Sequence, residues 1–283
     1  MVKKKQILIL VSLVVTGGAF WSLLQVYSLQ KNDELRVDFL NVGQGDSILI
    51  TAPNKTRMLI DTGPNQAVLS SLGSALPAHI THLDAVLLSH PDADHIGGTV
   101  DVFDMYDVSL LLVASSSKHN EIIDAIYSNP VSKRELSRDM RIVLDPVSNV
   151  YAEVLAPDLS WNTDDSNDLS LVLKLVYGET CFMFTGDASK KVEQILVHTY
   201  ADTLDCDVLK VGHHGSNTST SEAFIGYISP THAIISAGKD NTFGHPHQEV
   251  LDVLAQFSSI IYRTDELGTI SFVSDGKEVE LEK

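Results

Sequence analysis

The sequence predicts an α/β protein in which two β-sheets pack face to face with helices on the outside, preceded by one membrane-spanning helix. Three observations lead to this fold class. Short apolar runs typical of strands occur in both halves of the chain and alternate with helical segments. No long or biased linker divides the chain after residue 34, so one body is expected. The N-terminal segment contains a long run without charge.

That run, Ile7–Leu29, follows three consecutive lysines at positions 3–5. As a helix its 23 residues would span roughly 35 Å, enough to cross the hydrocarbon core of a bilayer. The positive flank places residues 1–6 in the cytoplasm and the body outside it. The alternative is a cleaved signal peptide and a secreted body, but the run lacks a small-x-small exit. We therefore predict an uncleaved single-pass anchor in residues 1–31 and a folded domain in residues 32–283.

The body is strongly acidic. The chain has 20 basic and 37 acidic residues, a net charge of −17, and residues 1–31 hold four lysines and no acid, so the remainder carries 16 − 37 = −21. Nucleic-acid affinity comes largely from basic side chains that displace counterions. This balance excludes a passive phosphate-binding surface, and a polyanionic substrate would need bound metal or a local basic patch.

The two cysteines exclude a disulfide framework and a four-cysteine zinc site. Cys181 and Cys206 open two predicted strands. A disulfide between them is an option outside the cell, but we expect buried free thiols.

In the first half of the body, an antiparallel meander of three strands is expected at 35–42, 46–52 and 57–63. A helix at 66–78, a buried strand at 84–90 and a helix after Gly97-Gly98 follow. The pattern then predicts a strand near 108–114 and a helix near 119–128. Residues 129–150 are weakly patterned and are expected to connect or cap.

In the second half, strands and helices alternate again. Strands are expected at 152–157, 169–177, 181–187, 207–212 and 232–238. The helices between and after them are expected at 189–200, 219–228 and 247–257. Two last strands, at 260–264 and 269–273, lead to a hairpin turn at Asp275-Gly276.

Four metal-ligating side chains fall within six residues, directly after the predicted strand 84–90 and directly before two glycines: His90, Asp92, Asp94 and His95. A strand that ends in a tight loop points such side chains into one space. Imidazoles and carboxylates are suitable donors for Zn²⁺ or Mn²⁺, and two metals close together would need this many. The cluster therefore predicts a metal site.

The cluster resembles the H-x-H-x-D-H signature of the metallo-β-lactamase fold, with Asp92 in place of the second histidine. It is most similar to the variant H-x-D-x-D-H of the extracellular metallo-β-lactamase domain in the ComEC family of DNA-uptake proteins. Further matching motifs stand in order along residues 35–280: FLNVGQGDSILI at 39–50, LIDTG at 59–63, DLSLVLKL at 168–175, FTGD at 184–187, LKVGHHGS at 209–216 and GHPH at 244–247. The resemblance implies a four-layer αββα sandwich. The family's channel helices and oligonucleotide-type barrel domain have no counterpart in the sequence, so a stand-alone relative that cannot itself conduct DNA is expected.

The resemblance also implies roles for single residues. It gives His90 and Asp92 to a first metal and Asp94 and His95 to a second. It makes Asp187 the bridging carboxylate, His245 the last ligand, and Asp61 a supporting group beneath the metals. Asn167 and Ser216 are expected to contact substrate.

Two adjacent histidines follow the strand 207–212. One imidazole there could bind metal while its neighbour serves the substrate, since a pKa near 6.5 suits proton exchange. We assign His214 to the substrate and His213 to the metal, and the sequence leaves their exchange open. Asn167 and Asp168 stand where zinc hydrolases of the family have a third-motif histidine. Together with Asp92 this makes the site rich in oxygen and favours Mn²⁺, with Zn²⁺ or Mg²⁺ as alternatives.

The leading functional hypothesis is a membrane-anchored, extracytoplasmic hydrolase with two divalent metal ions. Two cations would activate a water and polarise a phosphoryl oxygen, Asp94 would orient that water and His214 would assist the leaving group. By resemblance, the substrate is a phosphodiester, foremost DNA, and a separate DNA-uptake channel is a candidate partner. The alternatives are another phosphodiester of the cell envelope, acyl hydrolysis of β-lactams or thioesters, and a non-catalytic binding module of an uptake machine. The oligomeric state is not predicted.

Overall fold

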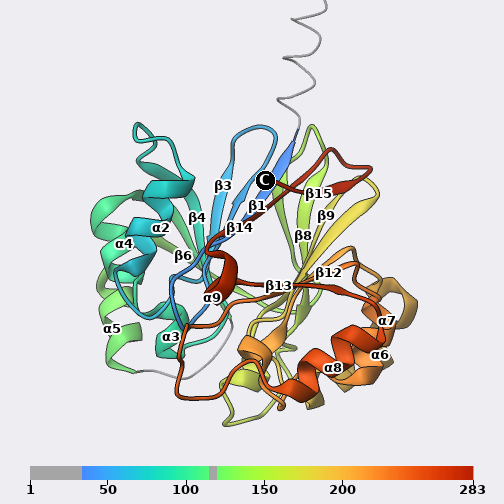
Figure 1. Ribbon diagram of the computed structural model, residues 1–283. Helices are drawn as coiled ribbons and strands as arrows, with labels where there is room; N and C mark the ends of the chain where they lie inside the picture. The colour runs from blue at the N-terminus through green and yellow to red at the C-terminus, as the bar shows by residue number, and fades with distance from the viewer. Residues whose placement is uncertain (1–33, 115–119, 283) are drawn as a thin grey trace, which may run out of the picture. The chain divides into compact units, whose positions relative to one another are not determined.

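The structure, a computed structural model, describes residues 34–114 and 120–282. Within these ranges the chain from Leu35 onward forms one compact unit built on two β-sheets. Helices cover the outer face of each sheet, so the predicted order of helix, sheet, sheet and helix is confirmed (Figure 1).

The first sheet combines an antiparallel part with a parallel part. The meander of β1, β2 and β3 is confirmed, and β3 to β6 run parallel to one another. The C-terminal hairpin joins this sheet through β14, which pairs with β1. The order across the sheet is β15 (Val279–Leu281), β14 (Ile270–Ser274), β1 (Leu35–Phe39), β2 (Ile48–Thr51), β3 (Arg57–Ile60), β4 (His82–Leu88), β5 (Asp107–Ala114) and β6 (Ser132–Leu136).

The second sheet is also mixed. Its strands β10 to β13 are parallel, whereas β7 to β10 are antiparallel. The order across it is β13 (Ile260–Arg263), β12 (His232–Ile235), β11 (Val208–Lys210), β10 (Thr180–Phe184), β9 (Val172–Tyr177), β8 (Val150–Ala156) and β7 (Arg141–Asp145).

Two groups of helices flank the sheets (Figure 1). Those against the first sheet are α2 (Ala67–Ala75), α3 (Ala93–Ile96), α4 (Thr99–Met105) and α5 (Glu121–Ser128). The second sheet carries α6 (Lys190–Tyr200), α7 (Glu222–Ile228) and α8 (Gln248–Gln256). Short helical turns complete the chain at α9 (Thr264–Leu267), η1 (Asn167–Leu169), η2 (Ala201–Leu204) and η3 (Gly212–Gly215).

The core follows from the alternation of side chains along the strands. One apolar cluster lies between the sheets, where Phe39 of β1 meets Phe184 of β10 with ring centroids 6.2 Å apart. Each sheet also has one apolar cluster between its outer face and the helices that cover it. Because β10 is buried at every position, its residues 181–184 form a continuous apolar run that the sequence identifies as a strand.

The prediction that residues 129–150 only connect or cap is wrong, because they form β6 and β7. Both are edge strands, one in each sheet. Polar side chains dominate β6 (SKREL), since an edge strand buries little and charges there discourage pairing with other chains. The apolar signal that marks a strand was therefore missing.

The expectation of free thiols is also wrong, because Cys181 and Cys206 are joined by a disulfide. The reason lies in the pairing of β10 with β11. Phe182 is the partner of Val208 in this parallel pair, so Cys181 lies beside the residues that lead into β11. The Cα atoms of Cys181 and Cys206 are 5.2 Å apart. Sequence spacing does not reveal that register.

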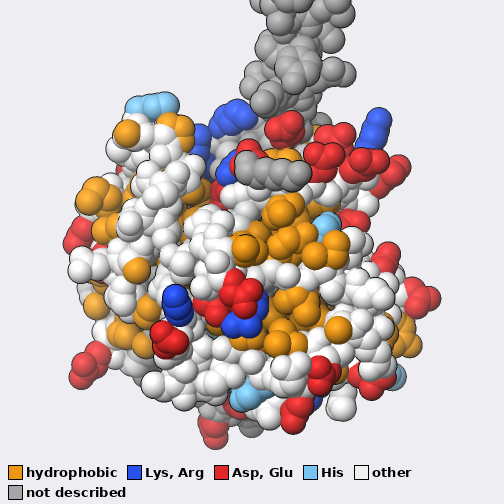
Figure 2. All heavy atoms as spheres, in the orientation of Figure 1, with side chains coloured by type: hydrophobic (Ala, Val, Ile, Leu, Met, Phe, Trp, Pro, Cys, Tyr) orange, Lys and Arg blue, Asp and Glu red, His pale blue; other side chains and the backbone are white. Residues whose placement is uncertain are grey.

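The predicted anchor Ile7–Leu29 lies outside the described residues. Among the residues that are described, no helix combines the length and apolar character needed to cross a bilayer. Figure 2 shows one face of the domain, on which acidic side chains are spread around the outline and basic side chains are few, in line with the acidic composition.

Candidate metal centre

The predicted site residues lie in loops at the carboxyl ends of parallel strands. Asp61 follows β3, the segment from His90 follows β4, Asp187 follows β10, and the paired histidines follow β11. The carboxyl ends of parallel strands meet at one edge of a sheet. The structure brings these loops together around Asp187.

The segment after β4 turns at once into the short helix α3. Asp92 stands at its N-cap, and its carbonyl oxygen accepts hydrogen bonds from the backbone of His95 and Ile96. This turn buries His90 and His95, whereas the side chains of Asp92 and Asp94 remain 42% and 34% exposed. The buried imidazoles thus face inward and the two carboxylates border solvent.

Asp61 contacts this segment through three hydrogen bonds. Its carboxylate accepts hydrogen bonds from the backbone and hydroxyl of Ser89, both at 2.7 Å, and lies 2.8 Å from His95 Nδ1. The Ser89 hydroxyl also lies 3.0 Å from His90 Nδ1. With both Nδ1 atoms engaged, the Nε2 atoms of His90 and His95 point into the site.

Asp187 lies at the centre of the cluster and is buried. Its carboxylate oxygens lie 3.2 Å from His95 Nε2, 3.9 Å from His90 Nε2 and 3.8 Å from His214 Nε2. Burial by itself raises the pKa of Asp187, but His95 and His214 hold it well below its ordinary value. Asp187 is therefore an anion enclosed by imidazoles.

The electrostatics of the imidazoles differ from one another. Burial lowers the pKa of His95, yet Asp187 and Asp61 raise it well above the ordinary value. Burial and the neighbouring His95 lower the pKa of His90. Burial also lowers the pKa of His214, but Asp187 and Asp46 raise it to about 9. Protons on His95 and His214 thus supply the positive charge that balances the carboxylates.

The paired histidines sit in an unusual backbone conformation. His213 and His214 have φ values of 48° and 54°, in the left-handed region. Consecutive left-handed residues send the two rings to different places. His214 is buried, with Nε2 3.2 Å from Asp94, while His213 is 25% exposed, with Nε2 3.6 Å from Asp187 and Nδ1 3.0 Å from the Thr218 hydroxyl.

Sequence reasoning missed Asp46 and Lys210. Both are buried, and Lys210 Nζ lies 2.7 Å from one carboxylate oxygen of Asp46. The other oxygen lies 3.3 Å from Nδ1 of His214, which also lies 3.0 Å from the carbonyl of Ser236. The signals were the GQGD and LKVG motifs, where an acid and a lysine interrupt apolar strand sequence.

The close packing of the GQGD turn explains why position 45 is a glycine. Gly45 has φ of +143°, and a Cβ there would lie 2.2 Å from the backbone oxygen of Asp94. The turn therefore packs directly against the metal-ligand segment, which also accepts a hydrogen bond from the Asp46 backbone.

His245 lies at the rim of the cluster. Its ring centroid is 5.7 Å from that of His213 and 6.3 Å from that of His214. Burial and the neighbouring histidines lower the pKa of His245 to about 4, and its Nδ1 has no hydrogen-bond partner among the described residues. A hollow of about 640 Å³ opens beside it, and its lining includes Lys239 and Arg263 as well as three acids, Asp240, Asp265 and Glu266.

The two predicted substrate-binding residues lie at the borders of the site. Asn167 is in η1, and its Oδ1 is buried without a hydrogen-bond partner among the described residues. Ser216 is buried after η3, where its hydroxyl lies 3.0 Å from that of Thr218.

The donor set fits divalent metal ions. His90 Nε2, His95 Nε2 and Asp187 Oδ1 are buried and make no hydrogen bond among the described residues, although the last two lie 3.2 Å apart as an ion pair. Such atoms are costly to bury unless they bind something. Four groups place their ligand atoms within 4.8 Å of one another: His90–His95–Asp187, Asp94–His95–His214, Asp46–Asp61–His95 and Asp46–Asp187–His214. Asp187 occurs in two of these groups, and its two carboxylate oxygens could serve adjacent ions.

The comparisons with known proteins agree with this geometry. The family described as the metallo-beta-lactamase superfamily matches residues 40–239. ComE operon protein 3 of Bacillus subtilis (strain 168) is 35% identical over 92% of this chain and 36% of its own length. Competence protein ComA of Neisseria gonorrhoeae is 32% identical over 85% of this chain and 32% of its own. The chain thus spans about a third of the length of these curated relatives.

Among solved structures, the metallo-beta-lactamase fold protein YhfI from Bacillus subtilis superimposes with a TM-score of 0.58. It is 14% identical, and the match covers 86% of this chain and 100% of that one. At this identity the likeness concerns the fold alone.

Proposed function

Because the chain belongs to the metallo-beta-lactamase superfamily of metal-dependent hydrolases, we propose that it is a phosphodiesterase that cleaves DNA outside the cytoplasm during DNA uptake. The observation that carries the proposal is the buried donor cluster around Asp187, whose unpartnered atoms suit metal ions. The link to DNA uptake is supported by the relative from Neisseria gonorrhoeae, whose name is competence protein ComA. The predicted anchor Ile7–Leu29 would hold the domain at the membrane, beside a separate channel.

His90, His95 and Asp187 would hold one ion. A second ion would be held by His214 together with Asp94, or by His214 together with Asp46 and Asp187. Divalent ions bound there supply Lewis-acid polarisation of a phosphoryl oxygen and lower the pKa of water. Oxygen donors from Asp94, Asp187 and the nearby Asp92 support the preference for Mn²⁺. We expect Mn²⁺ to give faster turnover than Zn²⁺.

Side chains of the protein would orient the water and contact the substrate. The Asp94 carboxylate is 34% exposed and lies 3.2 Å from His214, so it is placed to orient a water at the border of the cluster. The position of His214 deep among the donors favours a ligand role for it, and the more exposed His213 is then the group that faces substrate. This exchanges the roles first assigned to the two histidines.

The hollow beside His245 offers a path for the substrate. Lys239, on its lining, is exposed. Three carboxylates share that lining, Asp240, Asp265 and Glu266, so the charge of Lys239 only lessens their repulsion of an approaching phosphate. The acidic body, at −21, still leaves DNA binding dependent on the metal ions, and we expect weak duplex binding in chelator.

The test uses the full chain, purified in detergent. Bound metal is measured, and turnover of DNA and of a small aryl phosphodiester is compared with Mn²⁺, Zn²⁺ and Mg²⁺. The proposal expects metal-dependent cleavage of both substrates. His214→Ala should lose metal, whereas His213→Ala should keep it and lose turnover by roughly 10²–10⁴-fold. Absence of cleavage with every cation would leave a binding module as the function.

A further inference from the structure

A separate cavity of about 190 Å³ lies between the loop that precedes η1 and the first turns of α6. Its lining includes Trp161, Thr163 and Asp168 from the loop and Lys191 and Ile195 from the helix. We propose that this cavity is a subsite for one nucleobase of the substrate, which stacks on Trp161. The proposal rests on the phosphodiesterase function and names a contact that selects nucleic acid over other phosphodiesters.

The cavity is tied to the candidate metal centre through short stretches of chain. Asp168 accepts a hydrogen bond from the hydroxyl of Ser189, two residues after Asp187. The hydroxyl of Ser170, two residues after Asp168, accepts a hydrogen bond of 3.2 Å from the Asp187 backbone. The next residue, Leu171, donates a backbone hydrogen bond of 3.0 Å to Ser89. These hydrogen bonds connect the wall of the cavity to Asp187 and Ser89, and the proposal places the base here when the phosphate of a nucleotide lies at the cluster.

Trp161 is held in place before any ligand binds. Its backbone donates a hydrogen bond of 3.0 Å to Asp158. Asp158 in turn accepts hydrogen bonds from the backbone and hydroxyl of Ser160 and lies 2.5 Å from the guanidinium of Arg138. The ring is partly buried against the apolar cluster behind the second sheet. A pre-positioned aromatic ring loses little conformational freedom when it stacks.

The charge of the cavity favours a neutral base over a cation. Its one carboxylate, Asp168, lies 2.7 Å from Lys191 Nζ and also accepts from Thr163 and Ser189. A quaternary ammonium group binds well to an aromatic ring that lies beside a free carboxylate. The carboxylate in this cavity is already paired, so the cavity does not favour such a cation. Stacking is also independent of net charge, so it can provide affinity where an acidic body repels the phosphate backbone.

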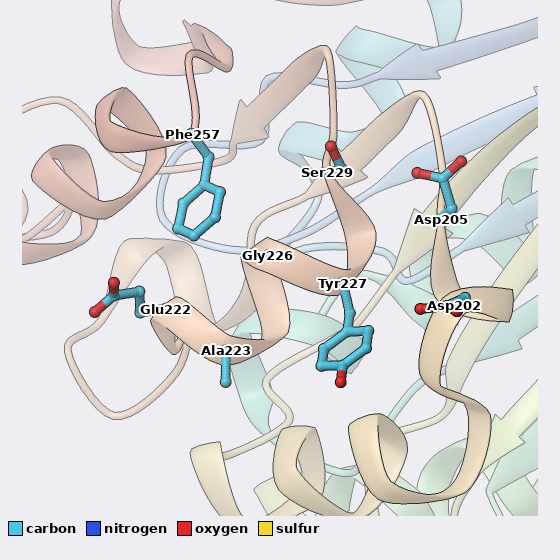
Figure 3. A pocket seen from close by; sticks show the side chains of 8 residues that line it. All are labelled: Asp202, Asp205, Glu222, Ala223, Gly226, Tyr227, Ser229 and Phe257. Atoms are coloured by element: carbon cyan, nitrogen blue, oxygen red, sulfur yellow. The ribbon is translucent and has the colours of Figure 1, made fainter.

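A second hollow provides a contrast. Figure 3 shows Asp202, Asp205 and Glu222 around Tyr227 of α7, and the residues that line this hollow include no lysine or arginine. Its exposed aromatic ring is comparable to Trp161, but its carboxylates would repel a nucleotide. Tyr227→Ala is therefore a matched control for Trp161→Ala.

The first experiment measures binding without turnover. In the full chain Trp21→Phe leaves Trp161 as the one tryptophan, since the sequence has 2. Its fluorescence is titrated with thymidine 5′-monophosphate, deoxyribose 5-phosphate and phosphocholine. We expect saturable quenching by the nucleotide and not by the other two. Quenching by phosphocholine alone, or none by the nucleotide, would overturn the proposal, and neither outcome depends on whether the chain hydrolyses phosphodiesters.

The second experiment compares two substrates with the same leaving group, thymidine 5′-(p-nitrophenyl phosphate) and methyl p-nitrophenyl phosphate. Trp161→Ala should lower the ratio of their kcat/KM values roughly 5- to 150-fold, the range of one base–aromatic stack. Trp161→Phe should restore most of the ratio, and Tyr227→Ala should leave it unchanged. A ratio that Trp161→Ala does not change would refute the subsite, whereas loss of hydrolysis of both substrates by the unmodified chain would refute the phosphodiesterase instead.

Discussion

The two halves of the candidate metal centre are built in different ways. The first half comes from one segment, in which His90, Asp92, Asp94 and His95 follow β4 directly. The second half is assembled from separate loops, which carry Asp187, the paired histidines and His245. One half is therefore local in sequence, whereas the other exists only once the second sheet has folded.

The residues that position the side chains of each half also differ. Asp61, at the end of β3, holds the first half from within the same sheet. His214 of the second half lies 3.3 Å from Asp46, which is in the turn between β1 and β2 of the first sheet. Asp46 in turn is paired with Lys210 of β11. The second half thus depends on the packing of one sheet on the other, and variants of each support should separate the two halves.

The largest effect is expected from Asp187→Ala, which removes the carboxylate that the two halves share. Metal content should fall toward one ion or none, because the positive charges that surround Asp187 lose their common anion. Turnover should fall with it to the background rate. Metal analysis and turnover of a small phosphodiester check both points, and full metal content in this variant would contradict a bridging position for Asp187.

Asp46→Asn should have the largest effect on stability. The change leaves the Lys210 ammonium buried and unpaired, at a cost of about 3–5 kcal/mol in the free energy of unfolding. Urea denaturation measures it. The double variant Asp46→Leu with Lys210→Met is the control, since apolar replacement of both partners should restore most of the stability. If the double variant is as unstable as the single one, the ion pair is not the reason.

The pH dependence of metal binding should reveal the protons that now occupy the site. Asp187 and Asp46 raise the pKa of His214 to about 9, and His95 is raised well above its ordinary value. Both imidazoles must lose these protons to bind metal, so metal affinity should rise with pH, by about tenfold per unit for each proton released.

The stability of the metal-free protein should change with pH in the opposite direction. A raised pKa stabilises the fold at low pH, and that contribution is lost as pH rises through about 9. Calorimetric titration of metal from pH 6 to 9 and thermal unfolding of the metal-free chain test the two signs.

The difference between the halves also explains what the sequence could predict. The clustered donors after β4 were recognisable because four ligands in six residues rarely have another reason. The arrangement of His213 and His214 was not predictable from the sequence, because it depends on the left-handed φ values of these two residues, which sequence spacing does not reveal. Asp46 was missed because its partners lie 164 and 168 positions away, at Lys210 and His214 (210 − 46 and 214 − 46). The edge strands β6 and β7 escaped because their side chains are largely polar or exposed.

A smaller effect is expected from Asp61→Ala, confined to the first half. It removes the acceptor that orients His95 and Ser89, and both oxygens of the Asp61 carboxylate are already occupied by these hydrogen bonds. Loss of such a support typically lowers metal affinity 10- to 100-fold. Asp84→Ala is the control, because Asp84 also accepts a backbone hydrogen bond, from Arg57 at 2.8 Å, at the opposite end of β4. Equal losses in the two variants would indicate general destabilisation of the first sheet.

The smallest effect concerns Asn120, which joins α5 to the first half. Its Oδ1 accepts a hydrogen bond of 2.8 Å from the Ile123 backbone as N-cap of α5, and its Nδ2 donates one of 3.0 Å to the carbonyl of Pro91. Asn120→Ala loses both and should lower the free energy of unfolding by about 1 kcal/mol. Asn120→Asp keeps the cap and loses only the donor to Pro91, so its stability should fall less.

Both Asn120 variants should keep their metal affinity nearly unchanged, which sharpens the contrast with Asp61→Ala. The metal-ligand segment has other anchors, since the Asp92 carbonyl accepts two backbone hydrogen bonds within α3 and Ser89 accepts one from Leu171. Losing one of several anchors leaves the rest to hold the imidazoles, whereas losing Asp61 frees His95 directly. Metal titrations of Asn120→Ala, Asn120→Asp and Asp61→Ala under one condition make the comparison. A tenfold loss of metal affinity in Asn120→Asp would mean that α5, as well as β3, positions the first half. The first half would then depend on a neighbouring helix even though its four ligands are continuous in sequence.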